Sequence, residues 1–118
     1  MNLLYLCKAC IIMEILFGSQ LLIDLYEGNK NNDKQFRSNP TLVKQFIKTV
    51  NNLKAIVKVT QLYQFKSLNY EKLKGDLKNY SSVRINKQYR LIFKELSSLD
   101  QPFEIVILKL EEISKHYE

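Results

Sequence analysis

The chain has 118 residues and a formal charge of +6, from 18 Lys and Arg residues against 12 Asp and Glu residues. With 46% hydrophobic and 25% charged residues it has the composition of a soluble globular protein, and its length suits one domain with a single core. These values exclude a disordered chain and a two-domain protein, and no apolar run approaches the roughly 18 residues of a membrane-spanning helix.

The positive charge is concentrated in the middle of the chain. Residues 40–94 contain twelve basic and two acidic residues, whereas the rest of the chain contains six basic and ten acidic residues. A cationic segment between acidic flanks is typical of a surface that binds a polyanion. Lysines on solvated helix faces explain some of these charges, but they do not explain arginines within predicted strands.

The N-terminal residues "MNLLYLCKACII" have the apolar character of a signal peptide without its other features. They lack a basic start, Lys8 interrupts the apolar run, and no A-x-A-like cleavage site follows. We therefore expect residues 1–12 to be an N-terminal extension or a misassigned start, and residues 13–118 to form the domain. Cys7 and Cys10 make a single C-x-x-C, for which two incidental thiols are a simpler interpretation than zinc or redox chemistry.

The first half of the domain predicts a strand followed by two helices. Residues 14–17 are β-prone and end at Gly18, after which Ser19 is suited to cap a helix that stops at Gly28. Residues 29–39 are polar and loop-like. Asn39 as a cap and Pro40 at the first helical position then begin a second helix. Its apolar face consists of Leu42, Val43, Phe46, Ile47, Val50 and Leu53, and its polar face of Lys44, Lys48, Asn51 and Asn52.

The second half of the domain predicts three strands. Residues 57–70 alternate enough for a strand but also fit an extended loop over the core, and Gly75 marks a turn. Residues 82–85 and 89–94 predict a β-hairpin that turns at residues 86–88. The segment "LSSLDQP" predicts another turn, and residues 103–110 predict the last strand. The element order predicts an α+β fold, β-α-α-β-β-β, with two N-terminal helices packed on a mostly antiparallel sheet.

Two arginines in the predicted hairpin are the strongest candidates for a functional site. Arg84 and Arg90 lie roughly opposite one another on neighbouring strands, where cross-strand side chains come close together. Two guanidinium groups directed at one spot repel each other unless an anion lies between them or internal acids neutralise them. Because few acids lie nearby in the sequence, we expect an external phosphate, which the planar guanidinium fork binds through two oxygens. Lys74 would add a third cation.

Aromatic and basic residues around these arginines indicate RNA binding. Tyr80, Tyr89 and Tyr117 offer stacking surfaces for unpaired bases, although Tyr89 is equally consistent with a half-buried sheet residue. The lysines expected to contribute to RNA binding are Lys72, Lys78 and Lys87. His116 is the single histidine, and a lone histidine near a chain end is more often an exposed residue than a catalyst. The sequence contains no phosphate-cradling glycine loop, no G-x-S-x-G motif and no metal-ligand pattern.

Residues 73–93, "LKGDLKNYSSVRINKQYRLIF", resemble the core signature of HigB toxins in the RelE/ParE superfamily. That signature is an L-K-G-D segment followed by S-x-R-x-N-x-Q-[YW]-R-[LI]-x-F. The expected element order extends the resemblance over about residues 13–117. The resemblance implies a RelE-like fold, with residues 13–118 as a single toxin domain of a bacterial type II toxin-antitoxin system.

The resemblance also implies an activity and a set of site residues. HigB-type toxins enter the ribosomal A site and cut translated messenger RNA by attack of the RNA 2′-hydroxyl, without a metal or other cofactor. Lys74, Arg84 and Arg90 match the phosphate and transition-state contacts of the family. His116 matches its C-terminal catalytic histidine. Tyr117 or Tyr89 would share the proton transfer or stack on a base. Because "KLEEISK" precedes His116, either the last strand runs on through Ile113 or His116 is misplaced for catalysis.

The expected partners follow from the same resemblance. They are a HigA-like helix-turn-helix antitoxin, the ribosome with its messenger RNA, and operator DNA only through the antitoxin, all in the cytoplasm and without a membrane. Two other functions stay open: a ParE-like toxin that poisons gyrase, and a catalytically inactive RNA-binding remnant. The close match of residues 73–93 favours the HigB-type ribonuclease over the ParE-type toxin.

Overall fold

A computed structural model of the chain describes residues 11–56, 59–100 and 103–115. Its helices and strands, with η for 3-10 helices, are β1 Ile11–Phe17, α1 Gln20–Glu27, α2 Lys34–Arg37, α3 Pro40–Lys54, α4 Val59–Gln64, η2 Lys66–Leu68, β2 Glu71–Lys72, η3 Gly75–Leu77, β3 Ser81–Arg84, β4 Tyr89–Asp100 and β5 Phe103–Lys115. This order confirms the predicted α+β class, with two more short α-helices, two 3-10 helices and one more short strand than the sequence indicated.

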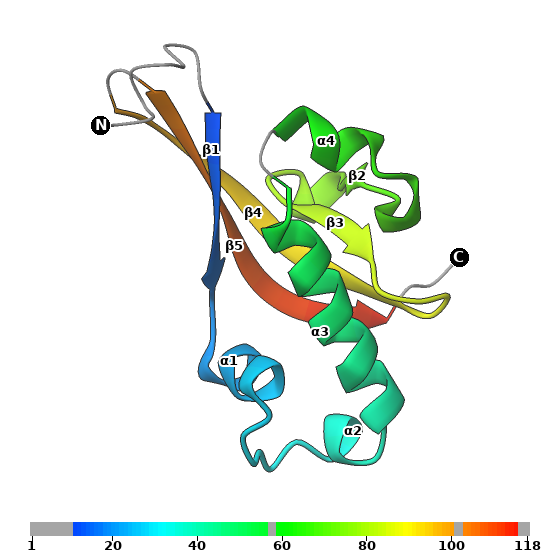
Figure 1. Cartoon of the computed structure of the whole chain (residues 1–118). Coiled ribbons are helices and arrows are strands. Elements are labelled where there is room, and N and C mark those ends of the chain that lie inside the picture. The colour runs from blue at the N-terminus through cyan, green and yellow to red at the C-terminus, as the bar shows by residue number, and fades with distance from the viewer. Residues whose placement is uncertain (1–10, 57–58, 101–102, 116–118) are drawn as a thin grey trace.

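The strands form one five-stranded sheet in the order β1-β5-β4-β3-β2. The first and last strands, β1 and β5, pair in parallel, and every other neighbouring pair is antiparallel. The long β4–β5 hairpin forms the centre of the sheet (Figure 1). The predicted mostly antiparallel sheet is therefore confirmed.

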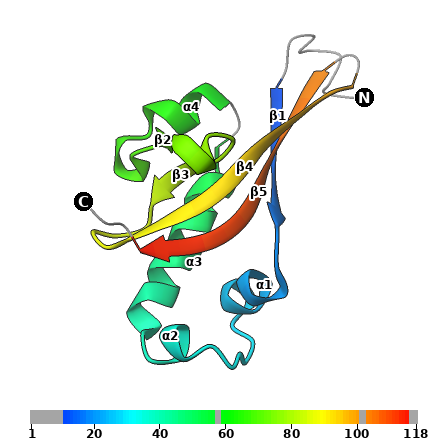
Figure 2. The same ribbon diagram turned by 180° about the vertical axis from the view of Figure 1, so that it is seen from behind.

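The helices cover one face of this sheet. Figure 1 shows α3 crossing in front of the strands, and Figure 2 shows β4 and β5 from behind with no helix over them. Between the two layers, α3 buries the apolar face that its sequence predicted, including Phe46 and Leu53, against strand residues such as Phe93. Each of these three side chains is fully buried, so the single core that the composition predicted lies between α3 and the sheet.

The principal helices begin and end where their capping residues predict. The Ser19 side chain accepts the Leu22 N–H at the start of α1, and Gly28 ends that helix with a φ of 77°. The Asn39 side chain accepts the Leu42 N–H at the start of α3. Gly18 has a different role, because its N–H donates to the carbonyl of Leu110 at 2.8 Å and an added Cβ would overlap that oxygen.

Three of the predicted loops or turns are wrong. Residues 34–37 form α2, because Asp33 caps the segment and Phe36 is buried under it. Residues 59–68 form α4 and η2 rather than a strand or an extended loop, with Leu62 and Leu68 buried. The segment predicted as a turn at 96–102 belongs to β4 as far as Asp100, since its backbone groups continue the ladder with β5.

The bounds of the outer strands also differ from the sequence prediction. β1 begins at Ile11 rather than at residue 14, and its first two residues pair with Glu104 and Ile105. The interpretation of residues 1–12 as an extension stays a prediction, since residues 1–10, with Cys7 and Cys10, lie outside the described residues. β5 runs to Lys115, five residues beyond its predicted end.

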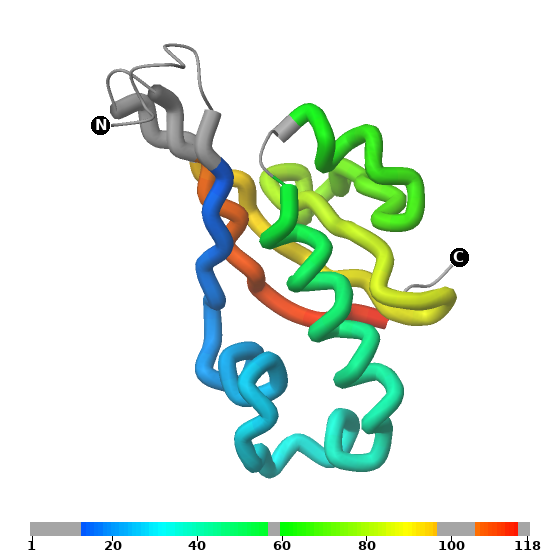
Figure 3. Tube along the Cα trace, viewed as in Figure 1, coloured from blue at the N-terminus to red at the C-terminus, as the bar shows by residue number. Residues whose placement is uncertain are grey.

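The connection from α3 to β3 completes the edge of the sheet. Figure 3 follows this green part of the chain through α4 and η2, which gather beside β2 and β3. Because β2 pairs with β3 through Glu71 opposite Ser82, the connection brings Glu71 and the preceding loop next to the hairpin that carries both candidate arginines. This is the part of the fold that shapes the candidate site.

Candidate functional site

The β3–β4 turn fixes the two arginines in register. Arg84 and Arg90 are direct cross-strand partners, as the sequence predicted. The Asn86 side chain holds the turn, because its Oδ1 accepts the N–H groups of Gln88 at 2.8 Å and Tyr89 at 2.9 Å. Its Nδ2 donates to Oε1 of Gln45 at 2.7 Å, which attaches the turn to α3. Asn86 was part of the sequence motif, but its role in holding the turn was not predicted.

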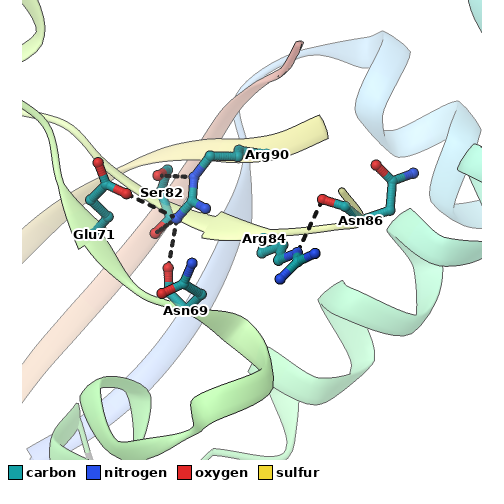
Figure 4. Close-up of polar contacts among 6 residues, drawn as sticks. All are labelled: Asn69, Glu71, Ser82, Arg84, Asn86 and Arg90. Atoms are coloured by element: carbon teal, nitrogen blue, oxygen red, sulfur yellow. Dashed lines mark hydrogen bonds and ion pairs between the residues drawn. The ribbon is translucent and has the colours of Figure 1, made fainter. Parts of the chain in front are cut away.

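Arg90 is a buried arginine with several internal partners. Only 6% of its surface is exposed, and Figure 4 shows its guanidinium between Ser82, Asn69 and Glu71. Its Nε donates to Oγ of Ser82 at 2.7 Å, and its Nη2 donates to the Asn69 carbonyl at 2.6 Å. The carboxylate of Glu71 lies 3.8 Å from Nη2. Burial lowers the pKa of Arg90, Glu71 opposes this effect, and the charge of Arg84 adds to it.

The sequence predicted that an external phosphate, rather than an internal acid, neutralises both arginines. For Arg90 this prediction is wrong, because Glu71 lies beside its guanidinium. Glu71 was among the few acids of the cationic segment, but the short strand β2 that carries it was not predicted. The two guanidinium groups also do not converge on one spot, since that of Arg90 turns toward Asn69 and Glu71 and that of Arg84 turns the other way (Figure 4). Internal acceptors hold Arg90 in this direction.

Arg84 is the more available of the two cations. Its side chain is exposed, and its Nε donates to the Asn86 carbonyl at 3.3 Å. Within the described part of the chain no carboxylate forms an ion pair with it. An exposed guanidinium without an acid partner keeps its bidentate donors for an external anion.

The other predicted phosphate- and RNA-binding lysines are exposed. Lys72 lies on β2, Lys74 and Lys78 flank the 3-10 helix η3, and Lys87 lies in the β3–β4 turn. η3 begins with Gly75 at a φ of 67°, so glycine is favoured at the turn that the sequence placed there. Lys87 lies in the turn that follows Arg84, whereas Lys72 pairs with Ser81 at the other end of β3 and Lys74 and Lys78 lie in the loop between β2 and β3. These lysines give this side of the sheet positive charge, without a described contact between Lys72, Lys74 or Lys78 and Arg84.

The predicted stacking tyrosines have different environments. Tyr80 is half-buried, and Nζ of Lys94 lies 5.0 Å from its ring centroid. Tyr89 is half-buried at the start of β4 and packs against the core, so a sheet residue is the better interpretation of that side chain. Tyr117 and His116 lie outside the described residues.

β5 includes all the residues of the segment that precedes His116 in the sequence. Ser114 pairs with Arg90 and Lys115 pairs with Tyr89, so the strand runs on past Ile113. The strand thus ends beside the arginine hairpin, and His116 is the next residue in the sequence. The catalytic role of His116 stays a prediction.

A polar cleft of about 190 Å³ adjoins Arg84 on the side of α3. It lies between α3, the η2 segment and the end of β3, and its lining residues are Gln45, Lys48, Thr49, Asn52, Ser67, Leu68, Arg84 and Ile85. The sequence assigned Lys48 and Asn52 only to the solvated face of the helix. Because the cleft depends on how η2 and β3 approach that face, no local pattern could have indicated it.

A cluster of hydroxyl groups around Glu95 attaches the α4–η2 connection to the sheet. The carboxylate accepts hydrogen bonds from Tyr70, from Ser81 at 2.8 Å and from Tyr63 at 3.2 Å. Burial raises the pKa of Tyr70, and its hydrogen bond to Glu95 raises it further. The cluster fixes the chain just before Glu71 and thereby supports the partners of Arg90.

The described residues show neither a metal-binding cluster nor a helix suited to span a membrane. The described residues contain no group of three or more His, Cys, Asp or Glu side chains able to hold a metal ion. In the same part of the chain, no helix combines the length and the apolar character needed to cross a membrane.

The described residues form a two-layer α+β domain in which the β3–β4 hairpin carries both candidate arginines. Residues 16–100 match the family model of HigB-like toxins, described as the RelE-like toxin of the type II toxin-antitoxin system HigB. The chain belongs to this family, whose counterpart in such a system is an antitoxin. The match confirms the resemblance that the sequence motif indicated.

One solved structure shows a similar fold, and two more are similar to the chain at a lower TM-score. A YoeB/ParE toxin from Agrobacterium tumefaciens is 22% identical over 89% of this chain and 100% of that chain, with a TM-score of 0.52. The YoeB dimer from Staphylococcus aureus is 25% identical, and a heterotetrameric YoeB-YefM toxin-antitoxin complex from the same organism is 24% identical. Both cover 89% of this chain and 98% of theirs, with TM-scores of 0.40. No curated protein sequence matches the chain.

Proposed function

We propose that this toxin is a ribosome-dependent endoribonuclease that cleaves translated messenger RNA. The observation that carries the proposal is the exposed Arg84, which has no ion-pair partner among the described residues and lies within the part of the chain that matches the family model. Exposed lysines on β2, beside η3 and in the β3–β4 turn add positive charge to the same side of the sheet. A phosphodiester is the anion that such a surface binds best.

The reaction is an internal transfer within the RNA. The 2′-oxygen attacks the adjacent phosphorus, its proton passes to a base, and the bond to the 5′-oxygen breaks as an acid protonates that leaving group. A 2′,3′-cyclic phosphate and a free 5′-hydroxyl result. Arg84 and Lys74 stabilise the charge on the non-bridging oxygens, and His116 with Tyr117 moves the protons.

Arg90 has a second role in this proposal. Because its guanidinium is held by Ser82, Asn69 and Glu71, it fixes the chain around the site and adds positive potential to it. Arg84 makes the direct phosphate contact. The two arginines of the motif therefore divide the tasks of positioning and binding.

The proposed partners follow from the small number of proton-transfer groups. A toxin with so few of them depends on the ribosomal A site to align the 2′-hydroxyl with the scissile bond, since alignment supplies much of the rate. Its antitoxin is a HigA-like helix-turn-helix protein, through which the pair binds operator DNA. The toxin acts in the cytoplasm on ribosomes.

A ParE-like gyrase poison is the second candidate function. The solved relative from Agrobacterium tumefaciens has a name that covers both YoeB and ParE, so the shared fold does not separate the two activities. A catalytically inactive RNA-binding protein is the third candidate. In-frame cuts in translated messengers support the ribonuclease, DNA breaks with an SOS response support the gyrase poison, and neither outcome supports the inactive protein.

Induced expression in cells tests the proposed function. We expect the wild type to arrest growth and to cut translated messengers, and Arg84→Ala to lower the cutting by about 100-fold, as expected for one lost transition-state donor. His116→Ala should relieve the arrest as well. Lys30→Ala, an exposed lysine of the α1–α2 loop, is the control that should remain toxic. Full toxicity of Arg84→Ala and His116→Ala would reject the assigned site.

A further inference from the structure

The cleft beside Arg84 has the chemistry of an anion site. Of its eight lining residues, Lys48 and Arg84 are cations and none is an acid. Four others have amide or hydroxyl side chains, namely Gln45, Thr49, Asn52 and Ser67. A concave surface with two positive charges and several neutral donors, but no carboxylate, favours a negatively charged ligand that also carries hydroxyl groups.

Several of these donors are not used within the protein. The Gln45 and Thr49 side chains are held, because Oε1 of Gln45 accepts from Asn86 and Oγ1 of Thr49 donates to the Gln45 carbonyl. In contrast, the side chains of Lys48, Asn52 and Ser67 make no hydrogen bond or ion pair among the described residues. The cleft therefore combines a fixed wall with donors that can turn toward a ligand.

The position of the cleft links it to the proposed scissile site. Arg84 lines the cleft and also faces the surface formed by the β3–β4 turn, so one guanidinium borders both. The hydrogen bond from Asn86 to Gln45 ties this turn to α3, which keeps the two walls in place. An RNA strand whose scissile phosphate contacts Arg84 is therefore within reach of the cleft.

The size of the cleft limits what it holds. Pockets for drug-sized ligands measure roughly 300–1,000 Å³, so about 190 Å³ suits a phosphate with part of a ribose better than a complete nucleotide. The base would then remain outside. Contacts to phosphate and sugar carry no direct sequence information, so the cleft would add affinity without adding sequence preference.

We infer that the cleft between α3, η2 and β3 binds a phosphate and ribose of the RNA nucleotide adjoining the scissile bond, with Lys48 as the main phosphate ligand. The inference rests on the proposed ribonuclease function and extends its substrate contacts to α3. An acidic peptide segment is the other class of ligand with suitable charge. The hydroxyl and amide donors favour RNA, because a ribose also offers hydroxyl groups to them.

The test compares two uncleavable oligonucleotides of different length. Purified toxin is titrated at low salt with a 2′-O-methyl RNA dinucleotide, which contains only the scissile phosphate, and with the trinucleotide, which adds the next one. We expect the wild type to bind the trinucleotide more tightly, and Lys48→Ala to remove that gain while leaving dinucleotide affinity unchanged. The slope of log affinity against log salt for the trinucleotide should fall by about 0.7, the value for one phosphate contact on a single strand.

A matched control and a charge variant sharpen the test. Lys44→Ala removes an exposed lysine one turn earlier on α3, outside the cleft, and should keep the gain from the third nucleotide. Asn52→Asp places an acid in the cleft and should weaken trinucleotide binding. Equal losses in Lys44→Ala and Lys48→Ala, or no loss in Lys48→Ala, would overturn the inference. The inference would also be overturned if Lys48→Ala bound both oligonucleotides normally but lost affinity for an acidic antitoxin peptide.

This experiment separates the inference from the proposed function. Binding of uncleavable RNA does not require the catalytic step, so the length effect can hold even if the wild type cuts no messenger in cells. Conversely, the wild type could cut messengers in frame while Lys48→Ala binds the trinucleotide as tightly as the wild type does. That result would support the ribonuclease function and reject RNA binding in the cleft.

Discussion

At the scale of single residues, the two motif arginines differ in their surroundings although they are direct cross-strand partners. Arg84 is exposed and donates to one carbonyl, whereas Arg90 is buried and contacts Ser82, Asn69 and Glu71. Burying a guanidinium is unfavourable unless its donors are paired, and here the neighbouring chain supplies the acceptors. Under the proposed function, the same residue type would therefore serve binding at position 84 and structure at position 90.

This difference predicts unequal effects on stability. Arg90→Ala leaves the Asn69 carbonyl and the Ser82 hydroxyl without their partner, so we expect the free energy of unfolding to fall by about 2–3 kcal/mol. Arg84→Ala should change it by less than about 0.5 kcal/mol, as for other exposed positions. Glu71→Gln should cost less than about 1 kcal/mol, because 54% of the Glu71 side chain is exposed. Urea denaturation of the purified variants measures all three values.

Equal stability of Arg90→Ala and the wild type would contradict the assignment of Arg90 as a structural residue.

The register of the two arginines followed from the sequence, since the turn residues and the alternation of the strands determine it. The partners of Arg90 did not. Asn69 and Glu71 come from a segment whose local pattern fits several conformations, and long-range contacts, such as the packing of Leu62 and Leu68, select one of them.

At the scale of the elements, the connection α4–η2–β2 determines the shape of the site. It supplies Glu71 to the Arg90 cluster and Ser67 to the cleft beside Arg84. The hydroxyl cluster of Tyr63, Tyr70 and Ser81 around Glu95 attaches this connection to β4. The stability of this attachment should therefore depend on the protonation of Tyr70.

The raised pKa of Tyr70 predicts a loss of stability in alkaline solution. Above pH 10, the Tyr70 phenol ionises in the unfolded chain while the folded protein still holds its proton. The unfolded state then binds fewer protons, so the free energy of unfolding falls as the pH rises. We expect the wild type to lose up to about 1.4 kcal/mol per pH unit more than Tyr70→Phe between pH 10 and 12. Denaturation at a series of pH values gives both slopes, and parallel slopes would show that the cluster does not hold Tyr70 protonated.

At the scale of the whole molecule, the sequence predicted the class of fold and most of the layers. Strong capping residues and regular apolar spacing identified α1 and α3, because these features act within a few residues of each other. The full length of β4 and β5 was not predicted, since the polar segment "LSSLD" favours a turn unless a long partner strand satisfies its backbone groups. The cleft also depends on contacts between distant segments, which local patterns do not encode.

The fold places the cationic residues along one edge of the sheet and leaves the opposite strand, β1, against β5. Under the proposed function, the side formed by β2–β4, the adjoining loops and α3 would bind the RNA. A messenger held in the ribosomal A site is an extended polyanion that such a side can contact at several phosphates. The ribosome would supply the alignment that the few proton-transfer groups of the chain do not.

Cleavage of a defined messenger by purified toxin, with and without ribosomes, tests this account most directly. We predict rapid cutting of the messenger in the A site of programmed ribosomes, little or no cutting of the same RNA alone, and at least a 100-fold slower reaction with Arg84→Ala. Rapid cutting of the free RNA, or equal cutting by Arg84→Ala on ribosomes, would contradict a ribosome-dependent site centred on Arg84.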